Sequence, residues 1–568
     1  LSIRRQRQMC IRDSTLPDDP ETFGGYFDSG STWTTNSLTE TRNDDYNVTS
    51  QAIANYMGTF GSHNLTVMAG FENYYMKSES LGAARDKYEL TGYPYLNIGS
   101  EDFQTNSGTG SEYTSNSVFG RVIYSYADRY LFQANVRHDG SSRFAKGYRW
   151  GTFPSFSAGW VASEEKFMKN LKWDWLSFLK LRGSWGMLGN ERIGSNYFPY
   201  IALMSFGNSL FYMADGSVVS DKTARPAVLA VEDITWETTT STDLGLDVNF
   251  LNNRLQFHFD YYWKETKDML LNIEIPYFMG YNNPSTNAGK MSTHGYDIEV
   301  AWNDQIGDFK YGVNVNFSDF LSKIDYMNDG EQISGGKIKR AGVLFNEFYG
   351  YVCEGIYQTQ EEVNNSARTS TTVTVGDLKY RDISGPDGVP DGVISPEYDR
   401  VPLGNSLPRF QYGGSLNASY KGIDFSLAFQ GIGKQNSYLS TSMVQPLRDN
   451  YGNVPAILEG KYWSPFNTTE ENLAAKYPRL SNVSKSNNYA TSNFWMFNGS
   501  YFRLKNITLG YTLPKSWTQK AGINRARFYV SGSDLFCLSN FPSGWDPEMG
   551  TSDYPITTSL VMGIQVNF

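Results

Sequence analysis

The chain has 568 residues and a formal net charge of −10 at pH 7. This charge disfavours a nucleic-acid partner, because phosphate binding needs a basic face. The mean hydropathy is −0.46, and we find no apolar run of the roughly 20 residues that a membrane-spanning helix needs, which argues against an α-helical membrane protein. Aromatic residues make up 15% and charged residues 19%, a balance that fits either a membrane β-barrel or a tyrosine-rich extracellular sandwich.

The first segment, residues 1–14, is strongly basic and unlike the rest of the chain. It lacks the apolar stretch of a secretory signal, so we interpret it as a non-native read-through segment. Residues 15–45 are expected to form a lead-in or loop.

Alternation of apolar and polar residues predicts strands through most of the remaining chain. Residues 65–71 and 130–137 show it first, and residues 244–250 and 255–264 show it most clearly. The short Asn252-Asn253 turn between the last two segments predicts an antiparallel hairpin.

Further strands are expected toward the carboxyl end of the chain, at residues 296–302, 309–317, 412–420, 423–429, 528–530 and 559–568. In residues 500–514 the apolar positions change from even to odd numbers, which predicts a bulge near Lys505-Asn506.

About fifteen such segments alternate between short turns and long polar loops. The expected long loops are residues 82–113, 189–237, 325–346, 361–407 and 436–493. This organisation favours an all-β, antiparallel transmembrane barrel with long extracellular loops. A charge on the lipid face costs about 2–4 kcal/mol near the midplane, so Arg254, Asp260 and Lys264 are expected to face a wet lumen. The alternation alone would also fit a soluble sandwich with its apolar faces inside.

Catalysis has no support in the sequence, so the chain is not expected to be an enzyme. Three cysteines and four histidines are scattered without the spacing of a disulfide framework, a zinc site or a metalloprotease. The Glu164-Glu165 pair has no histidine partner and is interpreted as solvated.

One acidic loop, residues 382–399, could bind Ca²⁺, which takes six to eight oxygen ligands and favours glycine-rich turns. The candidate metal ligands are Asp382, Ser384, Asp387, Asp391 and Asp399. Two prolines and a spacing longer than the usual 12-residue loop favour instead a solvated turn cluster. No other cofactor is expected.

Several aromatic residues could stack on sugar rings, although most are expected to serve as girdle or loop-packing residues. They are Trp173, Trp175, Tyr197, Tyr200, Phe211, Tyr212 and Trp495.

Eight motifs in order along the chain resemble the SusC/RagA-like branch of TonB-dependent outer-membrane transporters. They lie at residues 137–144, 153–160, 179–194, 292–300, 376–382, 500–514, 527–536 and 544–550. Each motif is weak by itself, and together they are specific.

The resemblance implies a barrel of roughly 22 strands with a plugged lumen. Residues 46–568 would supply about 14–16 of those strands, without the plug domain and the first strands. Such a fragment is not expected to insert stably or to transport by itself, because open sheet edges are not tolerated in lipid.

The resemblance also implies TonB-dependent import of a large nutrient across the bacterial outer membrane, most often a glycan oligosaccharide and otherwise a peptide. Its partners would be a SusD-like surface lipoprotein, TonB through the missing amino-terminal part, and outer-membrane lipid. Two alternatives remain: a barrel-anchored surface binding or adhesive protein, and a secreted β-rich glycan-binding protein.

Overall fold

The computed structural model describes residues 2–14, 36–88, 93–171, 173–193, 197–328, 330–439, 444–446, 454–481, 483–550 and 554–568. For residues 2–14 it describes the backbone. The expected lead-in over residues 15–35 lies outside the described residues. No helix in these ranges is long and apolar enough to cross a membrane.

Sixteen strands form the main sheet, and every pairing recorded between them is antiparallel. The antiparallel all-β fold expected from the sequence is therefore confirmed. In sheet order, the strands are β1 (Ser2–Ser14), β2 (Ser37–Phe60), β3 (His63–Asp86), β4 (Gln104–Tyr126), β5 (Tyr130–Ser141), β6 (Trp150–Val161), β7 (Leu176–Asn190), β10 (Glu237–Phe250), β11 (Leu255–Asn272), β12 (Ser285–Ile306), β13 (Phe309–Met327), β20 (Arg409–Tyr420), β21 (Ile423–Lys434), β24 (Tyr501–Thr512), β25 (Arg525–Ser539) and β26 (Ser559–Asn567).

Most connections alternate between short and long, as the sequence predicts. Two residues join β2 to β3, β12 to β13 and β20 to β21, whereas about eighty residues separate β13 from β20. Short turns mark the periplasmic end of an outer-membrane barrel and long loops mark its extracellular end. The turn after β10 has three consecutive residues with positive φ, at Leu251, Asn252 and Asn253, and asparagine is among the residues that tolerate this conformation best.

The chain forms two compact units. Unit 1 contains residues 1–157, 186–240 and 268–288, and unit 2 contains residues 158–185, 241–267 and 289–568. In unit 1, β2 and β3 pair along their whole length from Ser37↔Asp86 to Phe60↔His63. A buried cluster of Phe144, Phe153, Ile193, Ile234 and Trp236 forms the core of this unit.

Two boundaries in unit 1 differ from the expectation. The strand β2 begins at Ser37, inside the expected lead-in, and the expected loop 82–113 shrinks to residues 87–103. Small and polar residues make up the extra length of β3 and β4, so hydrophobic alternation gives no signal there. The backbone ladder between the two strands nevertheless continues to Arg85↔Gln104.

In both units the apolar face of the main sheet is bare. Phe132 and Val136 on β5 are 43% and 48% exposed, and Ile564 on β26 is 65% exposed. Leu255 and Phe257 on β11 are half-buried. None of these side chains is buried beneath a second layer. This exposure argues against the hypothesis of a soluble sandwich with its apolar faces inside.

The opposite face of β5 carries polar groups. Arg137 donates to Asp139 at 2.8 Å and to Ser117 at 2.8 Å, and it pairs with Glu72 at 3.3 Å. The predicted bulge is also confirmed, because the register of β24 against β25 shifts between Leu504 and Asn506.

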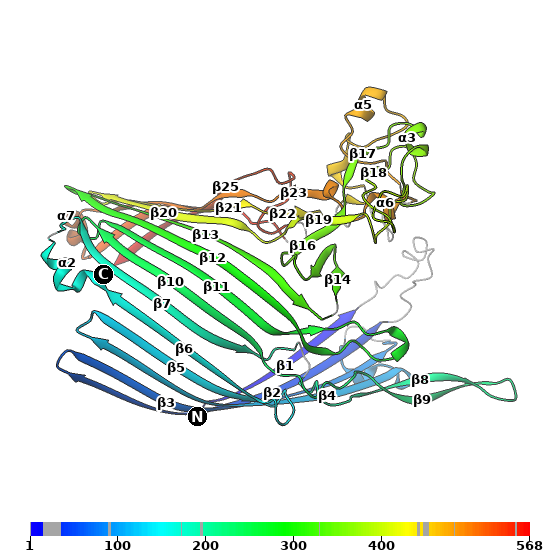
Figure 1. Cartoon of the computed structure of the whole chain (residues 1–568), viewed down its shortest axis with the longest axis horizontal. Helices are drawn as coiled ribbons and strands as arrows, with labels where there is room; N and C mark the ends of the chain where they lie inside the picture. The colour runs from blue at the N-terminus through cyan, green and yellow to red at the C-terminus, as the bar shows by residue number, and fades with distance from the viewer. Residues whose placement is uncertain are drawn as a thin grey trace. The chain divides into compact units, whose positions relative to one another are not determined.

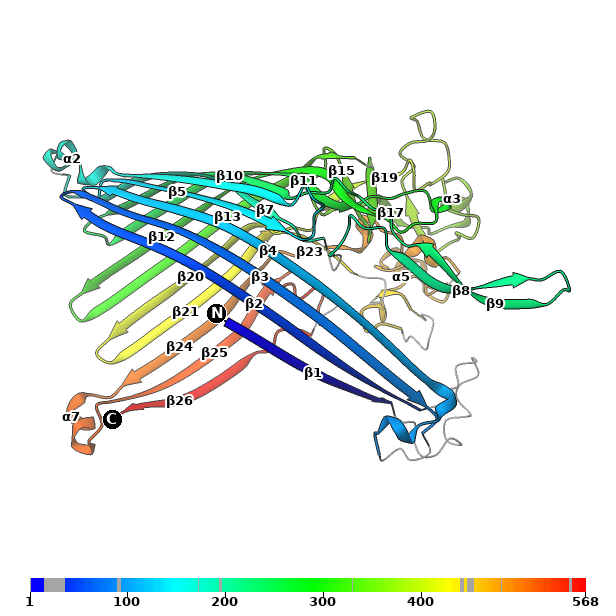
Figure 2. The same cartoon turned by 90° about the horizontal axis from the view of Figure 1, so that it is seen from below.

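In unit 2, the two longest connections fold together into a compact body that we call the loop domain, which consists of the described parts of residues 345–407 and 435–500. Figures 1 and 2 show its elements gathered at one end of the strands. These elements are β16 (Glu347–Tyr351), β17 (Cys353–Ile356), α3 (Gln360–Asn364), β18 (Leu378–Tyr380), β19 (Arg400–Asn405), β22 (Asn436–Tyr438), α5 (Thr469–Leu473), α6 (Lys485–Asn488) and β23 (Met496–Asn498).

Candidate functional site

The polar wall of unit 2 is organised around Arg182 on β7. Its guanidinium donates to Asp260 on β11 at 2.6 Å and to Asp247 on β10 at 3.2 Å. Asp243, also on β10, lies 3.7 Å away. One arginine therefore links carboxylates from two further strands on one face of the sheet.

Further groups extend this wall. The Nδ1 atom of His258 lies 3.0 Å from Asp247, and the Lys180 ammonium lies 3.8 Å from the same carboxylate. A Cβ atom on Gly245 would come within 2.4 Å of the Arg182 guanidinium carbon. The missing side chain at Gly245 thus leaves the space that the arginine occupies.

A second charged cluster joins the connection between β25 and β26 to the sheet. Arg503 on β24 is 3% exposed and contacts Asp546 at 2.6 Å and Glu548 at 2.5 Å. Lys505 contacts Asp534 on β25 at 2.8 Å. Burial opposes ionisation of Asp546, but the hydrogen bonds from Arg503 and from backbone amides outweigh it and lower the pKa of this carboxyl.

This wall can contact polar and charged groups. Its carboxylates are held by arginine and lysine, and the part of the chain that the structure describes contains no group of three or more His, Cys, Asp or Glu side chains arranged to hold a metal. The arrangement suits binding of polar groups.

The loop domain is held together by a buried polar core that joins its two segments. Asp377 is fully buried and accepts from Arg479 at 2.7 Å and from the side-chain amide of Asn488 at 2.9 Å. The amide oxygen of Asn488 in turn accepts from the backbone of Leu378 at 2.9 Å. The connection from β13 to β20 is therefore fastened to the connection from β21 to β24.

Asn487 and Trp495 complete this core. The side chain of Asn487 donates to the backbone oxygen of Leu378 at 2.9 Å, and its own backbone oxygen accepts from the Tyr380 hydroxyl at 2.6 Å. Trp495 donates to the backbone oxygen of Asn488 at 2.8 Å. Burial raises the pKa of Tyr380 well above its usual value, so this hydroxyl stays protonated and remains a donor.

The acidic loop proposed for calcium folds around Asp399. This fully buried carboxylate accepts backbone N–H groups from Ile383 at 2.7 Å and from Ser395 at 2.7 Å. Asp382 accepts from Gly392 at 2.7 Å, and Asp391 from Val393 at 2.9 Å.

Ser384 also donates its backbone N–H to Asp399 at 3.2 Å, whereas Asp387 is exposed. The structure thus brings four of the five candidate ligands into one turn region and gives Asp399 a structural role. Calcium binding remains a prediction.

The aromatic residues proposed for sugar stacking are dispersed. Trp173 and Trp175 stack at 5.4 Å near the short-turn end, and Trp175 also stacks on Phe250 at 5.8 Å, as expected of girdle residues. Trp495 is buried in the loop domain. Tyr197 lies under the Arg143 guanidinium at 4.4 Å in unit 1.

Phe211 and Tyr212 lie on an exposed hairpin of unit 1, formed by β8 (Met204–Tyr212) and β9 (Val218–Pro226). Tyr200 is half-buried, and its hydroxyl lies 3.5 Å from the backbone oxygen of Ser142.

Sequence reasoning missed Arg182 and the pairing of Asp377 with Asn488. Arg182 was detectable as a charge at an inward-facing position between Leu181 and Gly183. The Asp377–Asn488 contact joins residues 111 positions apart, and neither local composition nor periodicity signals it.

The comparison with protein families gives one match over almost the whole chain. The family described as "TonB dependent receptor-like, beta-barrel" matches residues 12–531.

TonB-dependent receptor P3 of Formosa agariphila is 30% identical to this chain, over 92% of the chain and 52% of its own length. TonB-dependent receptor SusC of Bacteroides thetaiotaomicron is 28% identical, over 92% of the chain and 50% of its own length. The chain thus spans about half the length of the curated relatives it matches.

Among solved structures, the chain is similar to "Structure of the RagAB peptide transporter", with a TM-score of 0.79 and 24% identity. The match covers all of this chain and 59% of the RagAB chain. A second, of the RagAB peptide importer in the "open-open" state, has the same TM-score at 23% identity.

Proposed function

The chain belongs to the TonB dependent receptor-like β-barrel family, and from this premise we propose that it takes part in energy-coupled import of a large nutrient. Its place is the bacterial outer membrane, where this family of SusC/RagA type is found. The two-faced strands carry the proposal, because a bare apolar face and a charged opposite face suit a wall between lipid and water.

The proposed substrate is a glycan oligosaccharide, with a peptide as the alternative. The peptide alternative is supported by the similar RagAB structures, whose titles name a peptide transporter and a peptide importer. The acidic and basic groups around Arg182 offer partners for hydroxyl groups of a sugar and for charged groups of a peptide.

Two protein partners are part of the proposal. A SusD-like surface lipoprotein would contact the long connections, among which the loop domain is the largest folded body described. TonB would supply energy from the periplasm.

The experiment is deletion of the gene in its host, followed by growth on defined oligosaccharides and on defined peptides as the limiting nutrient. We expect loss of growth on one of these classes, restored by the intact gene and not restored when TonB is inactivated. Unimpaired growth on both classes, with the protein present in the outer membrane of the parent strain, would contradict import. Co-purification of a surface lipoprotein tests the partner separately.

A further inference from the structure

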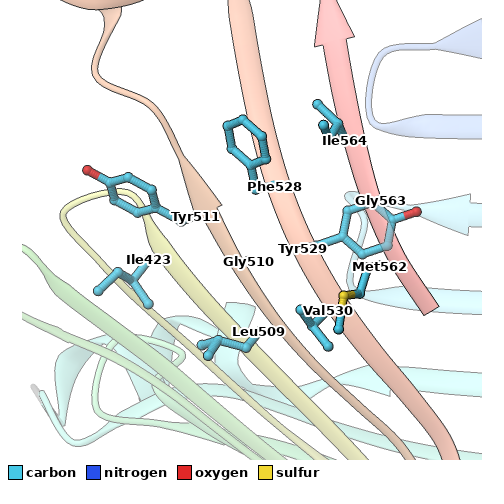
Figure 3. Close-up of a pocket in the computed structure, with 10 residues that line it drawn as sticks. All are labelled: Ile423, Leu509, Gly510, Tyr511, Phe528, Tyr529, Val530, Met562, Gly563 and Ile564. Carbon is cyan, nitrogen blue, oxygen red and sulfur yellow. The ribbon is translucent and has the colours of Figure 1, made fainter. Parts of the chain in front are cut away.

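An apolar groove of about 780 Å³ lies across the last four strands of the main sheet in unit 2. Figure 3 shows its lining side chains spread over β21, β24, β25 and β26. Seven of the ten lining residues come from two rows of paired residues, and Gly510, Tyr529 and Gly563 form the row between them. One row is Ile423, Tyr511, Phe528 and Ile564, and the other is Leu509, Val530 and Met562. The groove therefore lies on the apolar face of the sheet.

The opposite face of the same four strands is charged. Arg527 on β25 donates to Asp424 on β21 at 2.9 Å. A Cβ atom on Gly510, which lies between these strands on β24, would come within 2.5 Å of the Arg527 guanidinium and 2.6 Å of the Asp424 carboxylate. The groove is thus the lipid side of a wall whose water side carries this ion pair.

The groove lies at the short-turn end of the strands. Ile423 is the first residue of β21, and Met562 lies five residues before Asn567, the last residue of β26. At about 3.3 Å per residue, those five residues span about 16 Å along the strand. Because short turns face the periplasm in outer-membrane barrels, the groove extends from the periplasmic boundary into the inner leaflet.

The rim of the groove is basic. Lys421 lies in the turn before β21, Lys515 begins the short helix α7 (Lys515–Thr518), and Lys520 follows it. In segments 421–425, 509–530 and 560–568, Asp424 is the one carboxylate side chain, and it already pairs with Arg527. A chain with a net charge of −10 thus gathers three lysines here without a further carboxylate in the same segments.

Backbone hydrogen bonds hold the rim together. Thr512 donates to the oxygen of Gly422 at 2.7 Å, and Leu513 donates to the oxygen of Ala526 at 2.9 Å. Both views of the fold show α7 beside the carboxyl end of β26 (Figures 1 and 2). Next to Lys515, the Trp517 side chain is 64% exposed, as expected of a tryptophan at a membrane interface.

We propose that this groove and its basic rim bind one anionic glycerophospholipid of the periplasmic leaflet. The acyl chains occupy the apolar rows, and the phosphate lies among the lysines of the rim. Clustered cations beside an apolar membrane surface are the arrangement that recognises anionic lipid headgroups. The inference rests on the outer-membrane location and not on the identity of the imported nutrient.

The test is native mass spectrometry of the gene product that carries this chain, purified in detergent and titrated with phosphatidylglycerol or phosphatidylethanolamine. We expect at least fivefold tighter retention of phosphatidylglycerol. The double variant Lys515→Gln/Lys520→Gln should remove this preference. Val530→Trp, which fills the groove without changing charge, should weaken retention of both lipids.

The matched control is Lys166→Gln/Lys169→Gln in α2 (Lys166–Asn170), another short helix at a short-turn end with exposed aromatic neighbours. It should keep the preference. Equal retention of the two lipids, or an equal loss in the control variant, would overturn the proposal. Dimers that form in place of lipid adducts and disappear with Val530→Trp would assign the groove to a second copy and would also overturn it. Heat-modifiable mobility on gels verifies that every variant is folded.

Discussion

At the scale of single residues, Asp377 lies at the centre of the buried polar core of the loop domain. It is fully buried and accepts from Arg479, Asn488 and the backbone of Thr374. Removing one partner of a buried ion pair leaves an uncompensated charge, which costs about 3–5 kcal/mol.

Asp377→Ala is therefore expected to loosen the loop domain while leaving the strands in place. Cys353 reports this change, because burial raises the pKa of its thiol to about 11 and it should alkylate slowly at pH 8. We expect the variant to alkylate Cys353 at least tenfold faster, as measured by peptide mass spectrometry. Asp387→Ala, at an exposed position, is the control and should keep the slow rate. An unchanged rate in Asp377→Ala would show that the core tolerates the loss.

A second prediction concerns pH at Asp546. Its folded-state pKa is lowered, so its contribution to stability is complete above the unfolded value of about 3.9 and is lost as pH falls through the folded value. A spin label at the exposed Ser543 should stay immobile at pH 6 and become mobile in that acidic range. Asp546→Asn should mobilise the label already at pH 6. Mobility that does not depend on pH in the parent would refute the role of the Arg503 pairing.

At the scale of elements, the hairpin formed by β8 and β9 is unlike every strand of the main sheet. It pairs with itself, and its side chains are almost all exposed, with Phe206 at 80% and Tyr212 at 83%. An isolated two-stranded hairpin is marginally stable in water. The barrel strands therefore owe little stability to it.

Replacing residues 204–226 by a short glycine-serine linker should leave assembly intact. The expected result is unchanged heat-modifiable mobility and outer-membrane yield within about twofold of the parent. Replacing β22 and β23 in the same way is the contrasting control, because these strands adjoin the buried cluster of Leu439 and Trp495. A loss of assembly on removal of the hairpin would show that it has a structural partner.

The acidic loop gives a prediction at the same scale. If Ca²⁺ binds there, millimolar calcium should slow hydrogen exchange in residues 382–399, and chelator should reverse the effect. The hydrogen bonds of Asp399 to backbone amides should slow exchange at Ile383 and Ser395 in either condition. Identical exchange with calcium and with chelator would remove the metal site.

At the scale of the whole molecule, the alternation of side chains defines which solvent each face meets. The sequence predicts the strands, the hairpin at Asn252-Asn253 and the bulge near Lys505, because a period of two and a change of parity are local signals. It could not predict that Asp377 meets Asn488, nor that β3 and β4 continue through polar residues, because those features depend on contacts distant in sequence or on backbone pairing alone.

The alternation also predicts that an introduced arginine destabilises the fold by different amounts at two neighbouring positions on opposite faces of a strand. Phe132→Arg on β5 places the charge on the bare apolar face and should cost about 2–4 kcal/mol of folding free energy near the bilayer midplane. Gln133→Arg, on the opposite face, should cost less than about 1 kcal/mol. Urea titration of the gene product that carries this chain, in lipid vesicles, measures both. Equal costs would mean that lipid does not touch the apolar face.

The hydrogen bond between Asp377 and Asn488 restricts how the loop domain can acquire a new binding specificity. Each of the two long connections supplies part of the buried polar core: one supplies Asp377, and the other supplies Arg479 and Asn488. A chimaera that receives one connection from a relative and retains the other would mismatch the two parts. Grafting, whether by recombination in nature or by an engineer, should succeed when both connections travel as a matched set.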